Sequence, residues 1–300
     1  MSKVLIKVVI GVIVALVVCG ALLYLVLHDR HSSPSEPVVQ VTKEATTTPL
    51  KPAVTHEMVG TSVEGRSIDA YTYGTGATHL LFVGGMHGGY EWNSVLLAYE
   101  FMDYLEAHPD VVPANLSITV IPSANPDGVF KVIGKEGRFT LADAPTAPDV
   151  SGLGRFNVHG VDLNRNFDCH WKPESTWRSK KVSAGTSPFS EPESQAIRTA
   201  VTQVQQVAVV FWHSQSNAVY ASECDHGILP KTMDIMKAYA TAAGYPAVDS
   251  FDAYPVTGDS EGWLASIGIP AITVELKTHA TVEWDKNLLG IQALIKYFTS

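Results

Sequence analysis

Two histidines and a glutamate occur where short apolar runs of the sequence end. His87 and Glu91 lie in the glycine-rich segment GGMHGGYE, directly after the apolar letters HLLFV, and His213 follows the apolar run QVAVVFW. Two imidazoles and one carboxylate leave the fourth position of a tetrahedral Zn²⁺ open for water, which is what a hydrolytic zinc site needs. We therefore interpret His87, Glu91 and His213 as candidate ligands of one zinc ion.

The elements that position these residues are indicated by four nearly continuous apolar runs bounded by turn residues: His79 to Gly84, Leu116 to Pro122, Gln206 to Trp212 and Ala271 to Leu276. Runs of this kind fit strands that are buried on both faces of a mostly parallel sheet. Ser94 to Ala107 and Glu191 to Val204 are typical of helices between such strands, and Ser190 with Glu193 predicts a capping box on the second helix. The alternation indicates an α/β domain.

Four polar residues lie at the carboxyl ends of these predicted strands: His87, Asn125, His213 and Glu275. In open α/β sheets, ligands bind in the crevice beyond those ends. A carboxylate inside the apolar run AITVEL also costs free energy unless it has a partner or a role. The four residues therefore predict one assembled site.

The N-terminal region predicts a membrane anchor. Val8 to Leu27 is a run of twenty residues without a charge, which matches the thickness of a bilayer. Lys3 and Lys7 precede it, so residues 1–30 are expected to form a cytoplasmic stub and a single transmembrane signal anchor, with the catalytic part outside the cytoplasm. A cleaved signal peptide, which would make the protein secreted, is the alternative.

The remaining sequence divides into a linker and one domain. Residues 31–53 are rich in Pro, Ser and Thr and show no apolar period, so they predict a flexible linker. Residues 54–300 show no internal repeat and are expected to form one catalytic domain. The net charge of -9 and the pI of about 5.6 argue against a nucleic-acid partner, and we expect a monomer.

These residues occur together with several motifs that match one family. The chain resembles the zinc carboxypeptidases, also called funnelins, from about Val59 to Leu276. The motifs that carry the resemblance are, in chain order, His87 to Glu91, Asn125 to Gly128, Gly160 to Phe167, Phe189 to Glu193, His213-Ser214, Tyr254 with Gly258 and Trp263, and Val274 to Leu276. The resemblance implies one α/β domain with a mixed, mostly parallel sheet flanked by helices.

The resemblance also implies that His87, Glu91 and His213 hold the zinc ion. The family usually has two residues between the first histidine and the glutamate, whereas this chain has three, Gly88-Gly89-Tyr90. We expect the glycines to absorb the extra residue as a bulge. The alternative is that Glu91 only caps the helix that follows.

Glu275 matches the general base of the family. A carboxylate in that place takes a proton from the attacking water and passes it to the departing amine. A structural ion pair with Lys277 is the alternative. Arg155 matches the arginine that polarises the scissile carbonyl and stabilises the oxyanion, with Arg138 as a competing candidate.

The resemblance assigns four further residues to substrate binding. Asn164 and Arg165 are expected to bind the terminal carboxylate of the substrate, because a guanidinium can make two parallel hydrogen bonds to it. Tyr254 matches a mobile tyrosine that folds over bound substrate. Glu261 falls at the base of the side-chain pocket, where an acid would attract a basic terminal residue, although Asp259 lies close by in the sequence.

Cys169 and Cys224 follow the arginine motif and the second zinc histidine, so the family fold would bring their segments together. Outside the cytoplasm we expect them to form a disulfide rather than two free thiols.

The sequence thus predicts a zinc-dependent metallocarboxypeptidase that hydrolyses the C-terminal bond of peptides with a free C-terminus, with a preference for basic terminal residues. A murein peptide amidase or carboxypeptidase acting on diaminopimelate-containing cell-wall peptides is the first alternative. An inactive, membrane-tethered binding module is a less favoured one, supported only by the unusual spacing of His87 and Glu91.

Overall fold

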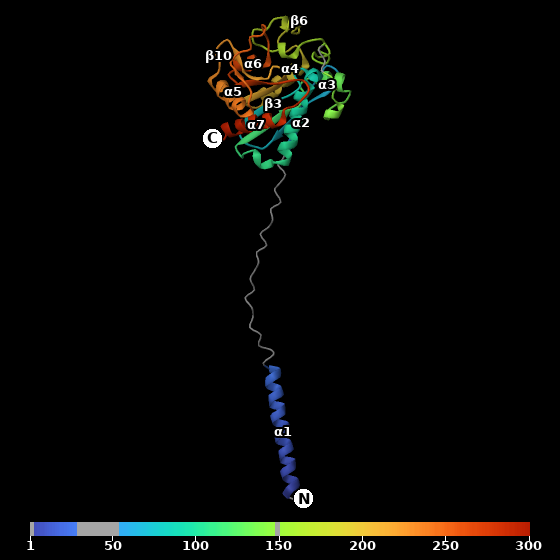
Figure 1. Ribbon diagram of the computed structural model, residues 1–300, viewed down its shortest axis with the longest axis vertical. Coiled ribbons are helices and arrows are strands. Elements are labelled where there is room, and N and C mark those ends of the chain that lie inside the picture. Colours follow the sequence, from blue (N-terminus) through green and yellow to red (C-terminus); the bar gives the residue numbers. More distant parts are fainter. Residues whose placement is uncertain (1–2, 29–53, 148–150) are drawn as a thin grey trace. The chain divides into compact units, whose positions relative to one another are not determined.

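The computed structural model describes residues 3–28, 54–147 and 151–300, with side chains described from residue 16 onward in the first helix (Figure 1). It divides into two compact units, Met1–Leu50 and Lys51–Ser300. The first unit contains helix α1, Lys3–His28. The predicted linker, residues 31–53, lies outside the described residues.

The membrane span that the sequence predicts, Val8 to Leu27, falls within α1. Over the described part of the chain, no helix combines the length and the apolar composition needed to cross a membrane. The predicted span therefore has no support from the structure. Its first residues, up to Ala15, lie outside the part whose side chains are described.

An eight-stranded mixed sheet forms the centre of the second unit, with its strands in the order β1-β2-β4-β3-β7-β12-β8-β11. The four central strands are parallel to one another, whereas β2 and β8 pair with them in the antiparallel sense. The bounds are β1 Val54–Thr61, β2 Ser67–Tyr73, β3 Thr78–Val83, β4 Leu116–Ile121, β7 Gln206–Ser214, β8 Ala218–Ala221, β11 Ala247–Val248 and β12 Ala271–Leu276. The four predicted strands are β3, β4, β7 and β12, so the expected mixed α/β sheet is confirmed.

Helices cover both faces of this sheet because the central strands are apolar on both (Figure 1). In β3, Leu80 and Phe82 belong to one hydrophobic core, while Leu81 and Val83 belong to the other. The first core includes residues of α2 (Trp92–Ala107), α5 (Pro230–Ala243) and α7 (Trp284–Tyr297), and the second includes α4 (Pro192–Gln203) and α6 (Ser260–Ser266). The two predicted helices correspond to α2 and α4.

The start of α4 differs from the prediction. Its N-cap residue is Glu191, and the expected capping box of Ser190 and Glu193 is wrong. The Ser190 hydroxyl donates to the Glu191 carboxylate, while Glu193 accepts hydrogen bonds from the backbone N–H of Val63 and from the side chain of Asn157. Groups that are distant in the sequence therefore replace the local cap.

Two small hairpins lie outside the main sheet. Strands β5 (Glu174–Trp177) and β6 (Lys180–Ser183) pair in the antiparallel sense, as do β9 (Glu223–Cys224) and β10 (Gly227–Ile228). Residues of both hairpins reach the cavity described next.

Candidate active site

A cavity of about 760 Å³ lies at the carboxyl ends of the parallel strands. The nine residues that the sequence assigned to metal, catalysis and substrate all line it: His87, Glu91, Arg155, Asn164, Arg165, His213, Tyr254, Glu261 and Glu275. The competing candidate Arg138 is instead half-exposed, forms an ion pair with Asp103 at 2.7 Å, and is not among the residues lining the cavity. The structure thus brings together residues that are far apart in the chain.

His87, Glu91 and His213 converge on one point of this cavity. Nδ1 of His87 lies 3.1 Å from Nδ1 of His213 and 2.8 Å from Oε1 of Glu91, and Nδ1 of His213 lies 2.9 Å from Oε2 of Glu91. Burial favours a raised pKa for Glu91, but the charges of His87 and His213 outweigh it and hold the pKa well below its usual value. Two imidazole nitrogens and an ionised carboxylate facing one another are a donor set that fits Zn²⁺.

The extra residue between His87 and Glu91 is accommodated by a short 3₁₀ helix, η2, Gly88–Glu91. Gly88 adopts a φ of +48°, and a Cβ there would lie 2.6 Å from the carbonyl oxygen of Gly154. A Cβ on Gly89 would lie 2.5 Å from Val132 of helix α3 (Pro126–Ile133). Only glycines allow this turn to approach its neighbours, and the turn returns Glu91 to a position beside His87.

Arg155 is held next to the ligand group by a buried carboxylate. Its Nε and Nη2 both donate to Oδ2 of Asp162, at 3.0 and 2.8 Å, and its Nη1 lies 3.6 Å from Oε1 of Glu91. The other oxygen of Asp162 lies 3.3 Å from Nε2 of His87. Burial favours a raised pKa for Asp162, but the charges of Arg155 and Arg165 hold it well below the usual value. Asp162 therefore contacts both His87, a candidate metal ligand, and Arg155, the candidate for stabilising the oxyanion.

Glu275 lies on β12 and is paired in register with His213 on β7. Its Oε2 accepts a hydrogen bond from the backbone N–H of Ser216 at 3.2 Å, whereas Lys277 is exposed. Burial raises the pKa of Glu275 to about 7; the charge of Glu91 adds to this effect and that of His213 opposes it. A carboxyl group with a pKa near neutrality suits a group that takes up and returns a proton.

Asn164 and Arg165 come from a second 3₁₀ turn, η5, Leu163–Arg165. Oδ1 of Asn164 accepts hydrogen bonds from both the backbone N–H and the hydroxyl of Ser260, each at 2.8 Å. The Nε and Nη2 atoms of Arg165 donate to the carbonyl oxygen of Thr176 at 3.3 and 3.2 Å. Both side chains are therefore fixed on the cavity wall by partners from other elements.

Glu261 lies in the first turn of α6 and is 4% exposed. Its oxygens accept hydrogen bonds from the hydroxyls of Thr273 and Ser260, at 2.8 and 2.9 Å. Asp259 is instead the N-cap of α6 and accepts from the backbone N–H of Gly262 at 2.7 Å. Burial, and then the charge of Glu261, raises the pKa of Asp259 to about 6. Both acids line the cavity, but Asp259 caps α6, whereas Glu261 accepts only from side-chain hydroxyls.

Tyr254 lies half-buried in the loop before α6. Its ring centre is 4.8 Å from that of Phe251, and it packs against the small apolar cluster of Tyr90, Trp177 and Val182. The phenol therefore lies on the cavity wall in this conformation.

Residues 44–289 match the family described as zinc carboxypeptidase. The chain belongs to this family. It is therefore a zinc metallopeptidase, and His87, Glu91 and His213 form its potential metal-binding group.

This metallopeptidase aligns with part of the length of several curated relatives. Gamma-D-glutamyl-L-diamino acid endopeptidase 1 from Lysinibacillus sphaericus is 23% identical over 239 residues, which is 73% of this chain and 59% of that protein. Murein peptide amidase A from Escherichia coli (strain K12) is 30% identical over 162 residues, 50% of this chain and 63% of that protein. Carboxypeptidase B from Astacus astacus is 29% identical over 171 residues, which is 53% of this chain and 54% of that protein. The chain thus spans less than two thirds of each relative.

Solved structures share the fold of this metallopeptidase. Thrombin activatable fibrinolysis inhibitor aligns with a TM-score of 0.64 and 19% identity, over 81% of this chain and 69% of that one. Murein-tripeptide amidase from Escherichia coli O157 aligns with a TM-score of 0.58 and 22% identity, over 80% of this chain and 91% of that one. At these identities the likeness establishes the zinc carboxypeptidase fold.

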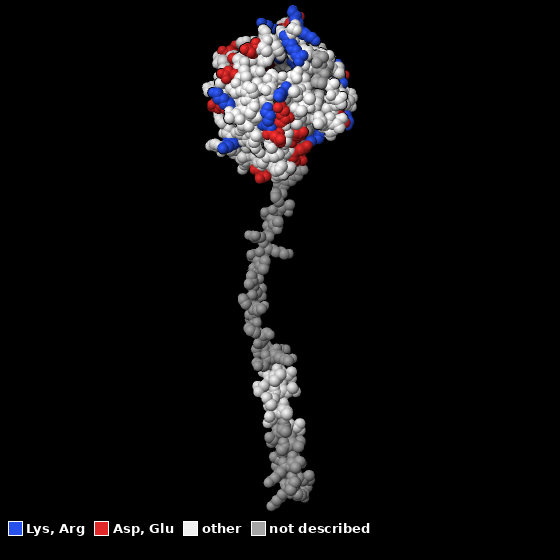
Figure 2. All heavy atoms as spheres, in the orientation of Figure 1, with Lys and Arg blue, Asp and Glu red and all other residues white. Residues whose placement is uncertain are grey.

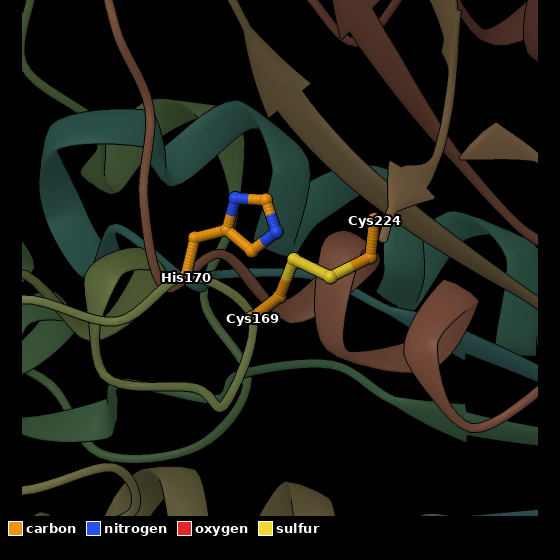
Figure 3. A group of neighbouring side chains, drawn as sticks. All are labelled: Cys169, His170 and Cys224. Carbon is orange, nitrogen blue, oxygen red and sulfur yellow. A yellow bond between two sulfur atoms is a disulfide. The ribbon is translucent and has the colours of Figure 1, made fainter. Parts of the chain in front are cut away.

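Cys169 and Cys224 form a disulfide, so that prediction is confirmed (Figure 3). The bond joins the loop after η5 to β9, and both residues line the cavity. His170 lies beside the disulfide, with Nε2 2.6 Å from Oδ1 of Asp225. Cys169, His170 and Cys224 lie close enough together to be considered as metal ligands. Because the two sulfurs are bonded to each other, this group does not offer thiolates to a metal.

The sequence analysis missed several residues that shape the site. Asp162 lies inside the motif Gly160 to Phe167 that carried the resemblance, so the motif itself was a usable signal. Tyr90 and Trp177 form an aromatic wall, with ring centres 5.4 Å apart, and His279 lies 4.6 Å from Tyr90. Nothing in their local sequence distinguishes them from ordinary core aromatics and surface histidines.

Proposed function

We propose that this zinc metallopeptidase is a carboxypeptidase that releases one residue from the free C-terminus of a peptide. The observation that carries the proposal is the fixed pair Asn164 and Arg165 in the same cavity as the ligand group and Glu275. A guanidinium binds a carboxylate through two parallel hydrogen bonds. A substrate is then positioned by its chain end, with its last peptide bond near Glu275.

The positions of the side chains support the following catalytic roles. Zinc bound by His87, Glu91 and His213 would polarise the scissile carbonyl and make the attacking water more acidic. Glu275 takes a proton from that water and passes it to the departing amine. Arg155 donates hydrogen bonds to the developing oxyanion, a type of interaction that is stronger in the transition state than in the substrate.

The preferred terminal side chain is basic under this proposal. Glu261 is buried at the cavity wall, beside Asn164's partner Ser260, and its negative charge favours a Lys, an Arg or a diamino acid over an apolar residue. Tyr254, in the loop that precedes α6, folds over the bound residue. Equal cleavage of peptides ending in Phe and in Arg would remove this preference from the proposal.

A cell-wall peptide is the second candidate substrate. Two of the relatives are named as a murein peptide amidase and as an endopeptidase acting at a diamino acid. The free amino group of a terminal diaminopimelate would meet Glu261 in the same way as that of lysine. The residues in the cavity serve either substrate, so the choice rests on measured rates.

The test is release of the terminal amino acid by the purified full-length protein. Peptides ending in Arg, Lys, Phe and diaminopimelate are incubated with and without a chelator, beside the Glu275→Gln variant. We expect rapid release of Arg, Lys or diaminopimelate, abolished by the chelator and reduced by at least about a thousandfold in the variant. Release that survives both treatments would contradict the mechanism.

We also propose that the catalytic unit acts outside the cytoplasm and is tethered to the cell membrane through the N-terminal segment. The proposal is supported by the charge-free run Val8 to Leu27 in the sequence and by the disulfide, which is typical of oxidising compartments. Cell fractionation with protease added to intact cells tests it. Protection of the catalytic unit from that protease would contradict it.

A further inference from the structure

Three arginine side chains lie along strand β5 and the turn that follows it. Arg165 donates to the carbonyl oxygen of Thr176, and Cζ of Arg155 lies 4.5 Å from the centre of the Trp177 ring. Arg178 comes next in the chain, with its Cζ 5.3 Å from the same ring. In the proposed function Arg165 binds the chain end and Arg155 the scissile carbonyl, whereas Arg178 has no assigned partner.

Arg178 is held at the rim of the cavity by its surroundings. It lies in the two-residue turn between β5 and β6 with a φ of +56°, which is uncommon for a residue other than glycine. Its Nη2 donates to the hydroxyl of Tyr90 at 3.1 Å. The Tyr90 ring in turn lies 4.6 Å from His279. Arg178 is thus placed on the part of the cavity wall that Tyr90 and Trp177 line.

The charge of Arg178 is available to a ligand. Lys181 on the same hairpin forms an ion pair with Glu174 at 2.8 Å, but no described acidic side chain pairs with Arg178. Lys180 lies 5.7 Å from the Trp177 ring and adds positive charge nearby. Figure 2 shows Lys and Arg side chains gathered around β6 at this end of the catalytic unit. An anionic group entering the cavity from this side would be attracted.

We propose that Arg178 binds a carboxylate on the residue that precedes the scissile bond. The inference rests on the proposed function, because Arg165 and Arg155 set the direction of the substrate. A chain that extends from Arg165 past Arg155 continues toward Arg178, so the group that Arg178 meets belongs to the acyl side of the bond. The peptidase then recognises a positive side chain at the terminal residue through Glu261 and a negative charge on the residue before it.

Such a carboxylate has two chemical sources. In an ordinary peptide it is the side chain of an α-linked glutamate or aspartate. In a γ-linked glutamyl peptide the side chain forms the scissile bond, and the free α-carboxylate is the group that Arg178 meets. Both are singly charged carboxylates that a guanidinium binds by paired hydrogen bonds.

The experiment compares four N-acylated peptides that all end in lysine. The residue before lysine is α-linked Glu, α-linked Gln, γ-linked Glu with a free α-carboxylate, or γ-linked Glu with that carboxylate amidated. For the full-length enzyme we expect kcat/KM to be about tenfold higher for the acidic member of at least one pair, which corresponds to roughly 1.4 kcal/mol. The pair that shows the difference identifies the source of the carboxylate.

The variant Arg178→Gln is expected to remove most of this acidic-to-neutral ratio, and Arg178→Lys to retain part of it. Lys181→Gln is the matched control, because it removes a cation from the same hairpin whose charge is already paired, and the ratio should stay within about twofold. Because each ratio is measured on one preparation, turnover of the amidated peptide reports that the variant is folded. A ratio that Arg178→Gln leaves unchanged, or that Lys181→Gln lowers equally, would overturn the proposal.

Failure of the proposed function gives a different result. If the wild-type enzyme releases lysine from all four peptides at equal rates, the carboxypeptidase activity stands and the role of Arg178 is wrong. If it releases lysine from none of them, the role of Arg178 is wrong, and the proposed function is wrong as well unless terminal Arg or diaminopimelate is released in the first experiment.

Discussion

The carboxylate of Asp162 touches two groups to which the proposed function gives different roles, His87 and Arg155. One oxygen accepts both hydrogen bonds from Arg155, and the other faces Nε2 of His87 at 3.3 Å. Loss of the charge should release the guanidinium and reduce the basicity of the histidine, and such partners typically affect metal affinity or activity by about 10–100-fold. We expect Asp162→Asn to lower kcat/KM by that amount and to weaken zinc retention during dialysis.

Asp168→Asn is the matched control for this variant, because Asp168 lies in the same loop and is exposed. Its kcat/KM and zinc content should equal those of the wild type. Unchanged activity in Asp162→Asn would show that Arg155 and His87 keep their positions without the carboxylate.

Glu275 predicts a pH dependence of a definite sign. Its pKa is raised to about 7, mainly by burial, and only the ionised form can accept a proton. Activity should therefore be lost as the pH falls, by about tenfold per unit below the midpoint of the acid limb. Because a bound cation favours the ionised form, that midpoint should lie at or below about 7. A kcat/KM profile over pH 4–9 measures it, and a midpoint above 8 would assign the limb to another group.

The sequence indicated the residues at strand ends better than those on loops. His213 and Glu275 stand out because each is polar at the end of an apolar run, and the sheet then pairs them in register. Asp162 and Trp177 gave no such signal, since their contacts with Arg155 depend on how a loop packs against the β5–β6 hairpin. A motif therefore located Asp162, but only the coordinates gave its two partners.

At the scale of elements, the turn η2 determines whether the ligand group can form. Gly88→Ala would add strain at a φ of +48° and place a Cβ 2.6 Å from a backbone oxygen of Gly154, which cannot easily move. We expect the free energy of unfolding to fall by about 2–4 kcal/mol and zinc affinity to fall with it. Urea unfolding and zinc titration measure the two effects.

Gly137→Ala separates strain from crowding. Gly137 also has a positive φ, +68°, but a Cβ there meets nothing within 4 Å. It should cost only about 1–2 kcal/mol and leave zinc affinity unchanged. Equal effects of the two substitutions would mean that the close approach of η2 to its neighbours is unimportant.

The central strands could be predicted because burial on both faces leaves a continuous apolar run, a signal that is local in sequence. The cap of α4 could not be predicted from such a local signal. Glu193 is three residues from Ser190, as a capping box requires, yet it accepts from the backbone of Val63, 130 residues away. A long-range partner replaced the local one, and local patterns contain no information about that exchange.

At the scale of the catalytic unit, the cavity is built by loops from opposite ends of the sequence. His87 and Arg155 come from the first half of the unit Lys51–Ser300, and the loop with Tyr254 and helix α6 come from its last fifty residues. The hydrophobic cores fix the strands, and on the α6 side the bond between Cys169 and Cys224 adds a covalent link between the loop after η5 and β9. Gly262 of α6 lies against Cys169, since a Cβ there would be 3.1 Å from the sulfur.

The disulfide should therefore contribute to both stability and substrate binding. It joins residues 55 apart, for which the chain-entropy estimate is about 4 kcal/mol and typical measured values are about 2–4 kcal/mol. We expect the double variant Cys169→Ser/Cys224→Ser to lose about 2–4 kcal/mol in urea unfolding under oxidising conditions. KM should rise more than kcat falls, because the loosened wall carries Glu261 rather than Glu275. Cys19→Ser, at an exposed cysteine of α1, is the control and should change neither quantity. A loss below about 0.5 kcal/mol in the double variant would show that the apolar contacts of α6 alone hold this wall.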